Sequence, residues 1–233
     1  MFEIHLADDL TVTSSTVSSP LVVLGKAGQG KTVFLLQLAL ELIKNKQRGL
    51  LYDPYGDLAA DIEKNLESEE AKKSAVFLTQ EEFVSSTEKI DSFVVVRGNT
   101  IEDGTAATRV VAEALLKKAY TLLGEEDWII IDQASGMVDD ELFSKYVAER
   151  DVPKTVLSDQ TLMDFSSKQR DELFAVAKQW AVYKVRNIDG KFIEDHLSDP
   201  MAKDIAAMQQ YHFYWLEDAK KLYTTGIFPT QPI

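Results

Sequence analysis

Short apolar runs alternate with longer amphipathic segments along most of the chain. The runs LVVLG (21–25) and GLLYDP (49–54) are short and almost wholly apolar, which favours strands that are buried on both faces. Between them, VFLLQLALELI is apolar nearly all round, so we expect a buried helix from about Lys31 to Asn45. Strands that alternate with helices predict an α/β fold with a mostly parallel central sheet.

The same alternation continues to the end of the chain. Asp57 is a candidate N-cap for an acidic helix over 56–70. The aromatic segment YHFYWL (211–216) is predicted to be a strand that packs into the core, although its rings also suit base stacking. Further strands are expected over 74–79, 91–98, 127–133, 154–160 and 179–187, and further helices over 104–123, 139–150 and near 198–210.

The domain organisation predicted from the sequence is simple. Segment 11–20 is polar and rich in Ser and Thr, which predicts a loop. We therefore assign residues 1–19 to an N-terminal strand and loop, and residues 20–233 to a single domain. A length of 233 residues suits one large domain, and no internal repeat or linker divides it.

Composition narrows the cellular setting. The chain has no cysteine, which excludes disulfides and thiolate metal sites and fits a reducing compartment. No stretch approaches the roughly 20 apolar residues that span a bilayer. The first ten residues carry acid rather than base and contain no signal-peptide core. The sequence therefore predicts a cytoplasmic protein without a membrane span.

The formal net charge of −13 argues against a basic surface over the whole molecule, but it permits a local basic stripe. Parts of the later half are less acidic, and their basic residues either form an ordinary solvated face or line a pore and meet phosphates. These residues are Lys168, Arg170, Lys178, Lys184 and Arg186. The three histidines are scattered along the sequence, so no zinc site is expected.

Residues 25–32, GKAGQGKT, match the phosphate-loop pattern G-x-x-x-x-G-K-[ST] in full. Glycines let backbone amides turn towards an anion, and the following helix adds its dipole. A plain glycine turn is the other interpretation, but an apolar strand before the loop and a long helix after it favour nucleotide binding. The candidate nucleotide-binding residues are Gly25, Ala27, Gly28, Gln29, Gly30, Lys31, Thr32 and Val33.

Another apolar run, WIII (128–131), is followed directly by Asp132. An aspartate at a strand end is common, but beside a phosphate loop it predicts an acidic partner for a metal ion. Thr32 and Asp132 are therefore the candidate Mg²⁺ residues, and Lys31 is expected to reach the β- and γ-phosphates of ATP.

Gln133 follows Asp132, where ATPases of this arrangement usually carry a glutamate. Glutamine holds a water by hydrogen bonds but cannot remove its proton as a carboxylate does. Three interpretations stay open. Hydrolysis is slow or the base comes from elsewhere, the residue is an engineered change that traps bound ATP, or the protein is a non-hydrolysing subunit.

These residues resemble the FtsK/HerA superfamily of DNA-pumping ring ATPases, and most of all the cytoplasmic motor domain of type IV secretion (conjugative) coupling proteins. The resemblance covers about 20–230 and implies a three-layer RecA-like P-loop NTPase domain. It depends on four landmarks in order, namely the phosphate loop, LLYDPYGDLAADI (50–62), WIIIDQAS (128–135) and AERDVPKTVLSDQTLMDF (148–165).

The resemblance suggests roles for further residues. Gln160 is expected to sense the γ-phosphate or its attacking water, and Arg150 to reach the nucleotide of a neighbouring subunit. The alternatives are a surface-loop glutamine and an arginine favoured by a helix C-terminus. Asp53 either supports the site or is a turn residue before Pro54. Arg97, Arg109 and Arg186 stay possible inter-subunit contacts. The all-helical DNA-facing insertion of coupling proteins has no counterpart in this sequence.

Three functions follow. The first is an ATP-driven motor that moves DNA as a ring, expected to be a hexamer. The second is a non-hydrolysing ATP-binding switch or docking subunit of a secretion or partition machine, which Gln133 and the negative charge favour. The third is a nucleoside kinase, but no arginine-rich lid is evident in the sequence.

Overall fold

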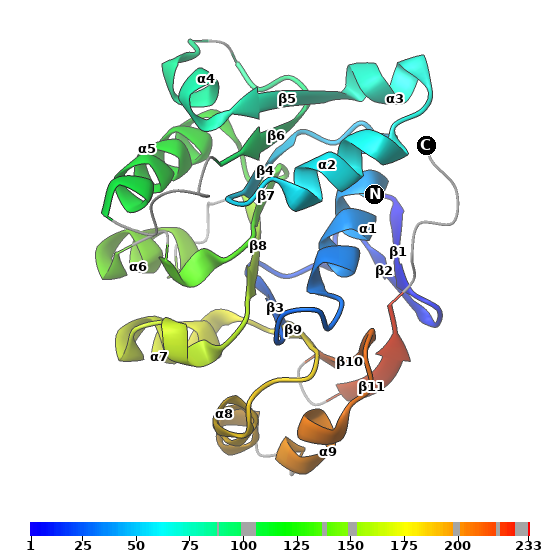
Figure 1. Ribbon diagram of the computed structural model, residues 1–233, viewed down its shortest axis with the longest axis vertical. Coiled ribbons are helices and arrows are strands. Elements are labelled where there is room, and N and C mark those ends of the chain that lie inside the picture. Colours follow the sequence, from blue (N-terminus) through cyan, green and yellow to red (C-terminus); the bar gives the residue numbers. More distant parts are fainter. Residues whose placement is uncertain are drawn as a thin grey trace.

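The computed structural model describes residues 1–87, 89–98, 106–136, 139–148, 153–197, 201–217, 220–226 and 233. These residues form a nine-stranded sheet through the centre of the molecule, in the order β11-β10-β9-β3-β8-β7-β4-β6-β5 (Figure 1). The strands are β3 (Leu21–Leu24), β4 (Gly49–Asp53), β5 (Ala75–Thr79), β6 (Phe93–Arg97), β7 (Trp128–Ile131), β8 (Lys154–Asp159), β9 (Gln179–Val182), β10 (His212–Glu217) and β11 (Lys220–Thr225).

The sheet is parallel from β9 to β5, and β10 and β11 extend it as an antiparallel hairpin. Strands β3, β4 and β7 are buried along their whole length, because helices cover both faces of a parallel sheet. The predicted α/β fold with a mostly parallel central sheet is therefore confirmed.

Two helical layers enclose this sheet (Figure 1). Alternate strand side chains enter opposite cores, as Val22 and Leu24 do on one face and Leu21 and Val23 on the other. One layer contains α1 (Lys31–Lys44), α2 (Asp57–Asn65) and α3 (Glu69–Ser74). The other contains α4 (Gln80–Ser85), α5 (Ala106–Leu122), α6 (Asp140–Ala148), α7 (Ser167–Val176), α8 (Asn187–Leu197) and α9 (Ala202–Ala207).

The N-terminal segment is more ordered than its composition predicts. Strands β1 (Glu3–Ala7) and β2 (Leu10–Thr13) form an antiparallel hairpin. Ile4, Leu6 and Val12 belong to the same buried cluster as the apolar side chains of α1. The prediction of a loop over 11–20 is therefore wrong at its start, since alternation of apolar and polar residues outweighs the Ser- and Thr-rich composition.

Helix boundaries differ from the prediction where local capping decides them. The single helix expected over 56–70 is two helices, because the side chain of Ser68 accepts a hydrogen bond from the amide of Ala71 and begins α3. Gly56, not Asp57, is the N-cap of α2, and Asp57 is its first residue. Helix α9 is shorter than the predicted 198–210, and β9 is shorter than the predicted 179–187.

Helices α4, α7 and α8 are absent from the prediction. Capping boxes were the available signal for two of them, since Thr79 pairs with Glu82 at α4 and Ser166 with Gln169 at α7. The strand predicted over 211–216 is confirmed as β10. Within the described ranges, no helix combines the length and apolar character needed to cross a membrane.

The hairpin is expected to be an integral part of the core. Ile4 is completely buried, so Ile4→Ala should lower the free energy of unfolding by about 3 kcal/mol through lost burial and an unfilled cavity. His5 points outwards on the same strand, and His5→Ala should change it by less than about 0.5 kcal/mol. Urea unfolding measures the change in the free energy of unfolding for both variants. Small and equal losses of stability would show that the hairpin does not contribute to the core.

Candidate nucleotide-binding site

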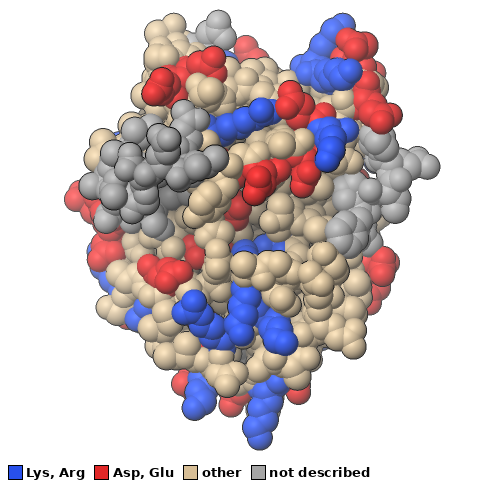
Figure 2. Space-filling model, in the orientation of Figure 1, with Lys and Arg blue, Asp and Glu red and all other residues tan. Residues whose placement is uncertain are grey.

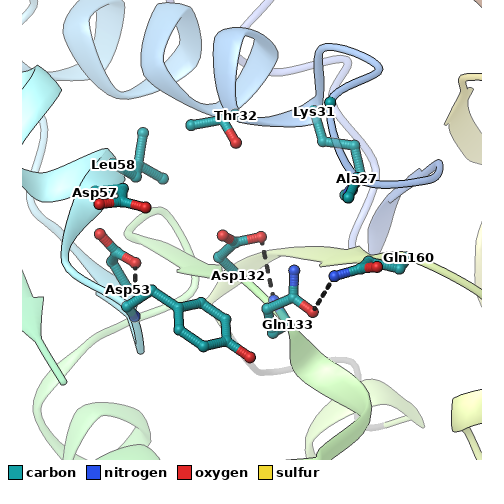
Figure 3. Close-up of a pocket in the computed structure, with 11 residues that line it drawn as sticks. Ala27, Lys31, Thr32, Asp53, Asp57, Leu58, Asp132, Gln133 and Gln160 are labelled. Carbon is teal, nitrogen blue, oxygen red and sulfur yellow. Dashed lines mark hydrogen bonds between the residues drawn. The ribbon is translucent and has the colours of Figure 1, made fainter. Parts of the chain in front are cut away.

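The carboxyl ends of β3, β4, β7 and β8 meet at one edge of the sheet, where a cavity of about 190 Å³ opens. Parallel sheets bind ligands at this edge because the loops after the strands converge there. Figure 3 shows Thr32 and Asp132 facing each other across the cavity. The lining residues are Ala27, Gly28, Lys31, Thr32, Asp53, Tyr55, Asp57, Leu58, Asp132, Gln133 and Gln160.

The phosphate loop leaves β3 and turns into α1 through two glycines. Gly28 has φ 72° and Gly30, the N-cap of α1, has φ 120°, values that residues with a side chain rarely adopt. Of the eight predicted loop residues, Ala27, Gly28, Lys31 and Thr32 line the cavity. Gly25, Gln29, Gly30 and Val33 are outside this lining. The first three belong to the loop, and Val33 lies in the first turn of α1.

The loop is supported from behind by residues far away in the sequence. A Cβ atom on Gly25 would lie 2.5 Å from Cβ of Tyr183, a fully buried residue just after β9. The amide of Lys26 donates to the carbonyl of Lys184 at 2.9 Å, and the amide of Tyr211 donates to the carbonyl of Gln29 at 2.9 Å. These contacts connect the loop to the segment after β9 and to the residue before β10.

Lys31 is buried and folds back over its own loop. Its Nζ donates to the carbonyl oxygens of Gly25 at 2.6 Å and Lys26 at 3.3 Å. Burial lowers the pKa of Lys31, and the nearby carboxylates of Asp132 and Asp159 oppose this effect. The ammonium is thus desolvated and held by neutral acceptors, so an arriving phosphate offers it a stronger partner.

Asp132 is 8% exposed and follows the last residue of β7. Burial raises its pKa from 3.8 to about 6, with a further contribution from the Asp53 carboxylate, while Lys31 acts in the opposite direction. A carboxylate and a hydroxyl that face each other suit Mg²⁺, which prefers oxygen ligands and keeps waters and phosphates as its other ligands. Thr32 and Asp132 therefore fit the predicted metal.

Gln133 and Gln160 approach each other at the cavity wall. The Nε2 of Gln160 lies 3.5 Å from the Oε1 of Gln133, and the amide of Gln133 donates to Asp132 Oδ1 at 3.1 Å (Figure 3). Gln133 has φ 57°, an uncommon left-handed conformation for a residue with a long side chain. Gln160 and Asp132 line the same cavity, and the roles of both glutamines stay predictions.

Asp159, which sequence reasoning missed, joins the two glutamine segments. Its Oδ1 accepts from the amide of Gln160 at 2.6 Å, and its Oδ2 accepts from the amide of Ser135 at 2.7 Å. Burial raises the pKa of Asp159, and these hydrogen bonds oppose that shift. The available signal was an aspartate at the end of the strand predicted over 154–160, just before Gln160.

Asp53 supports the opposite wall of the cavity. It is 1% exposed and accepts from the amides of Tyr55 at 3.1 Å and Ala59 at 2.8 Å, so it fixes the segment that enters α2. Tyr55, Asp57 and Leu58, which also line the cavity, were not predicted as site residues. They could have been predicted from their position in the sequence, because they follow a strand that ends at this edge of the sheet.

The candidate arginines are not brought together by the described structure. Arg97 pairs with Glu63 at 2.5 Å and lies over the ring of Phe77, and Arg186 is exposed. Arg150, the predicted trans arginine, and the side chain of Arg109 are outside the described residues.

Comparison with known proteins shows that this fold occurs in solved structures. No protein-family model matches the sequence, and no curated protein matches it. Among solved structures, VirB4 of Thermoanaerobacter pseudethanolicus superposes with a TM-score of 0.74 at 10% identity, covering 98% of this chain and 96% of that one. The fold is that of a RecA-like P-loop ATPase domain.

Two further structures support the same conclusion. The bacterial conjugative coupling protein TrwBdeltaN70 gives a TM-score of 0.67 at 12% identity and covers 97% of this chain and 88% of its own. The genome packaging NTPase B204 from Sulfolobus turreted icosahedral virus 2, in complex with AMPPCP, gives 0.58 at 16% identity and covers 91% and 100%. The resemblance predicted from the sequence is thus confirmed at the level of fold.

The raised pKa of Asp132 predicts a pH-dependent stability. Between pH 4 and about 6 the folded state holds a proton that the unfolded state has released, so this residue contributes less stability as pH rises. Without nucleotide, Asp132→Asn should therefore raise the free energy of unfolding by about 2 kcal/mol at pH 7.5, and by less as pH falls towards 4. Urea unfolding across this range is the measurement, and a gain independent of pH would contradict the assignment.

Proposed function

We propose that this chain binds ATP with Mg²⁺ and hydrolyses it as the motor domain of a DNA-translocating machine of the conjugative transfer or secretion type. One observation carries the proposal. A single cavity unites a phosphate loop, the Thr32–Asp132 pair and two facing glutamines. Its fold is shared with a genome packaging NTPase and a conjugative coupling protein.

In this proposal each of these residues has its own part in the chemistry. Loop amides and Lys31 would hold the triphosphate, and Thr32 and Asp132 would hold Mg²⁺, which neutralises charge on the β- and γ-phosphates. Gln133 and Gln160 would orient the attacking water. Neither amide removes a proton as a carboxylate does, so slow hydrolysis is expected of this chain.

A ring assembly is part of the proposal. ATP would lie between subunits of a homo-oligomer, expected to be a hexamer, with Arg150 of a neighbour completing the site. DNA would pass a local basic surface in the pore. In support, Lys26 and Arg186 are exposed near the phosphate loop and Lys184 is half-buried. Figure 2 shows a group of Lys and Arg side chains just below the centre of this face, and others in its upper half.

The second candidate is a switch in which ATP binding alone changes how the protein docks onto a secretion or partition machine. Gln133 favours it, because the usual carboxylate for activating water is replaced by an amide at this position. Both candidates share nucleotide binding and differ in turnover.

Two substitutions test ATP binding and ATP turnover separately. Lys31→Ala should weaken ATP binding at least about tenfold in titration calorimetry, because it removes the charge-assisted contact to phosphate.

Gln133→Glu should raise steady-state ATP turnover about tenfold or more by restoring a general base. Equal rates for Gln133→Glu and the wild type would contradict the assigned role of position 133, and unchanged ATP binding by Lys31→Ala would contradict the nucleotide site.

DNA distinguishes the motor from the switch. In the Gln133→Glu variant, added DNA should stimulate ATP turnover and lose this effect as salt rises, since phosphate contacts weaken with salt. Light scattering with ATP and Mg²⁺ should show a sixfold assembly. Hydrolysis that ignores DNA, together with a strict monomer, would favour the switch.

A further inference from the structure

Asp189 is a completely buried carboxylate in the first turn of α8, outside the lining of the nucleotide cavity. Its Oδ1 accepts hydrogen bonds from the Thr161 hydroxyl at 2.7 Å and from the Leu162 amide at 2.8 Å. Its Oδ2 is buried and has no hydrogen-bond partner among the described atoms. Burying such a group is costly, so its position requires an explanation.

The two donors follow Gln160 directly in the sequence. On the other side of Gln160, the Asp159 carboxylate accepts the amide of Gln160 itself. Thr161 is 1% exposed, so water cannot replace Asp189 as the hydrogen-bond partner of its hydroxyl. The backbone on each side of Gln160 is therefore anchored to a buried aspartate, while its side chain stays free to face Gln133.

An acid in the first turn of a helix often only balances the helix dipole. Asp189 differs because both hydrogen bonds recorded for its carboxylate lead to the segment after β8, 27 and 28 positions away, rather than to its own helix. The carboxylate thus joins the start of α8 to the chain that carries Gln160.

We propose that Asp189 is a positioning residue that sets the Gln160 side chain towards the γ-phosphate and its attacking water, acting through Thr161 and Leu162. The proposal rests on the proposed function, in which Gln160 has that role. It also gives α8 a connection to the site, because the segment before this helix supports the phosphate loop through the carbonyl of Lys184. One continuous segment, 183–189, thereby fixes both the phosphate loop and Gln160.

Thr161→Val removes, at nearly constant volume, the hydroxyl that donates to Asp189 and accepts from the Met163 amide. It should lower kcat for ATP about tenfold, because small misplacements of catalytic groups are costly, while KM and the dissociation constant for ATPγS change less than about twofold. Thr161→Ser restores the hydroxyl and should recover most of kcat. Asp189→Asn keeps the acceptor but removes the charge, and should lower kcat by a smaller factor, about threefold.

A control variant removes a hydroxyl hydrogen bond near the other end of β8. The Tyr120 hydroxyl lies 3.0 Å from Oγ1 of Thr155 on β8, far along the strand from Gln160. Tyr120→Phe should leave kcat unchanged. If it lowered kcat as much as Thr161→Val does, the effect would be general loosening of β8 and the proposal would be wrong.

A double-mutant cycle decides whether Asp189 acts through Gln160. In a Gln160→Ala background, Thr161→Val and Asp189→Asn should cause no further loss of kcat. Losses that multiply would overturn the positioning role while leaving the ATPase intact. If neither the wild type nor Gln133→Glu hydrolysed ATP above the Lys31→Ala rate, the proposed function itself would be wrong, and this inference with it.

Discussion

The parallel pairing of β3, β8, β7 and β4 is the constraint on which the rest of this molecule depends. The carboxyl ends of parallel strands lie at the same edge of a sheet, so the polar residues that follow each strand are brought close together there. Within the strands, most side chains are buried, and the apolar ones pack against helices on both faces. Packing in the interior of the sheet thereby stabilises the fold, and the polar residues at its carboxyl edge form the candidate site.

That edge holds charges in unfavourable surroundings. Asp132 and Asp159 are both nearly buried with raised pKa values, and Lys31 is desolvated against carbonyl oxygens. A divalent cation and a polyphosphate would relieve each of these conditions, since opposite charges compensate for lost solvation. These groups therefore lower the stability of the fold, and the proposed ligands would offset that cost.

Local signals were sufficient for the centre of the site and insufficient for its support. The phosphate loop and Asp132 were predictable, because a glycine pattern and a strand end determine them within a few residues. Gln160 was found through a resemblance, and the structure places it beside Gln133. Tyr183 and Asp189 were not predictable as supports, since their partners lie far away in sequence and only the assembled sheet brings them together.

The contact between Gly25 and Tyr183 has a consequence for how this protein changes over time. A methyl group added at position 25 would overlap the Cβ atom of Tyr183, an atom that every residue except glycine carries, so a smaller side chain in place of the aromatic ring would not make room for it. Position 25 is therefore expected to stay glycine among descendants, whatever side chain occupies position 183.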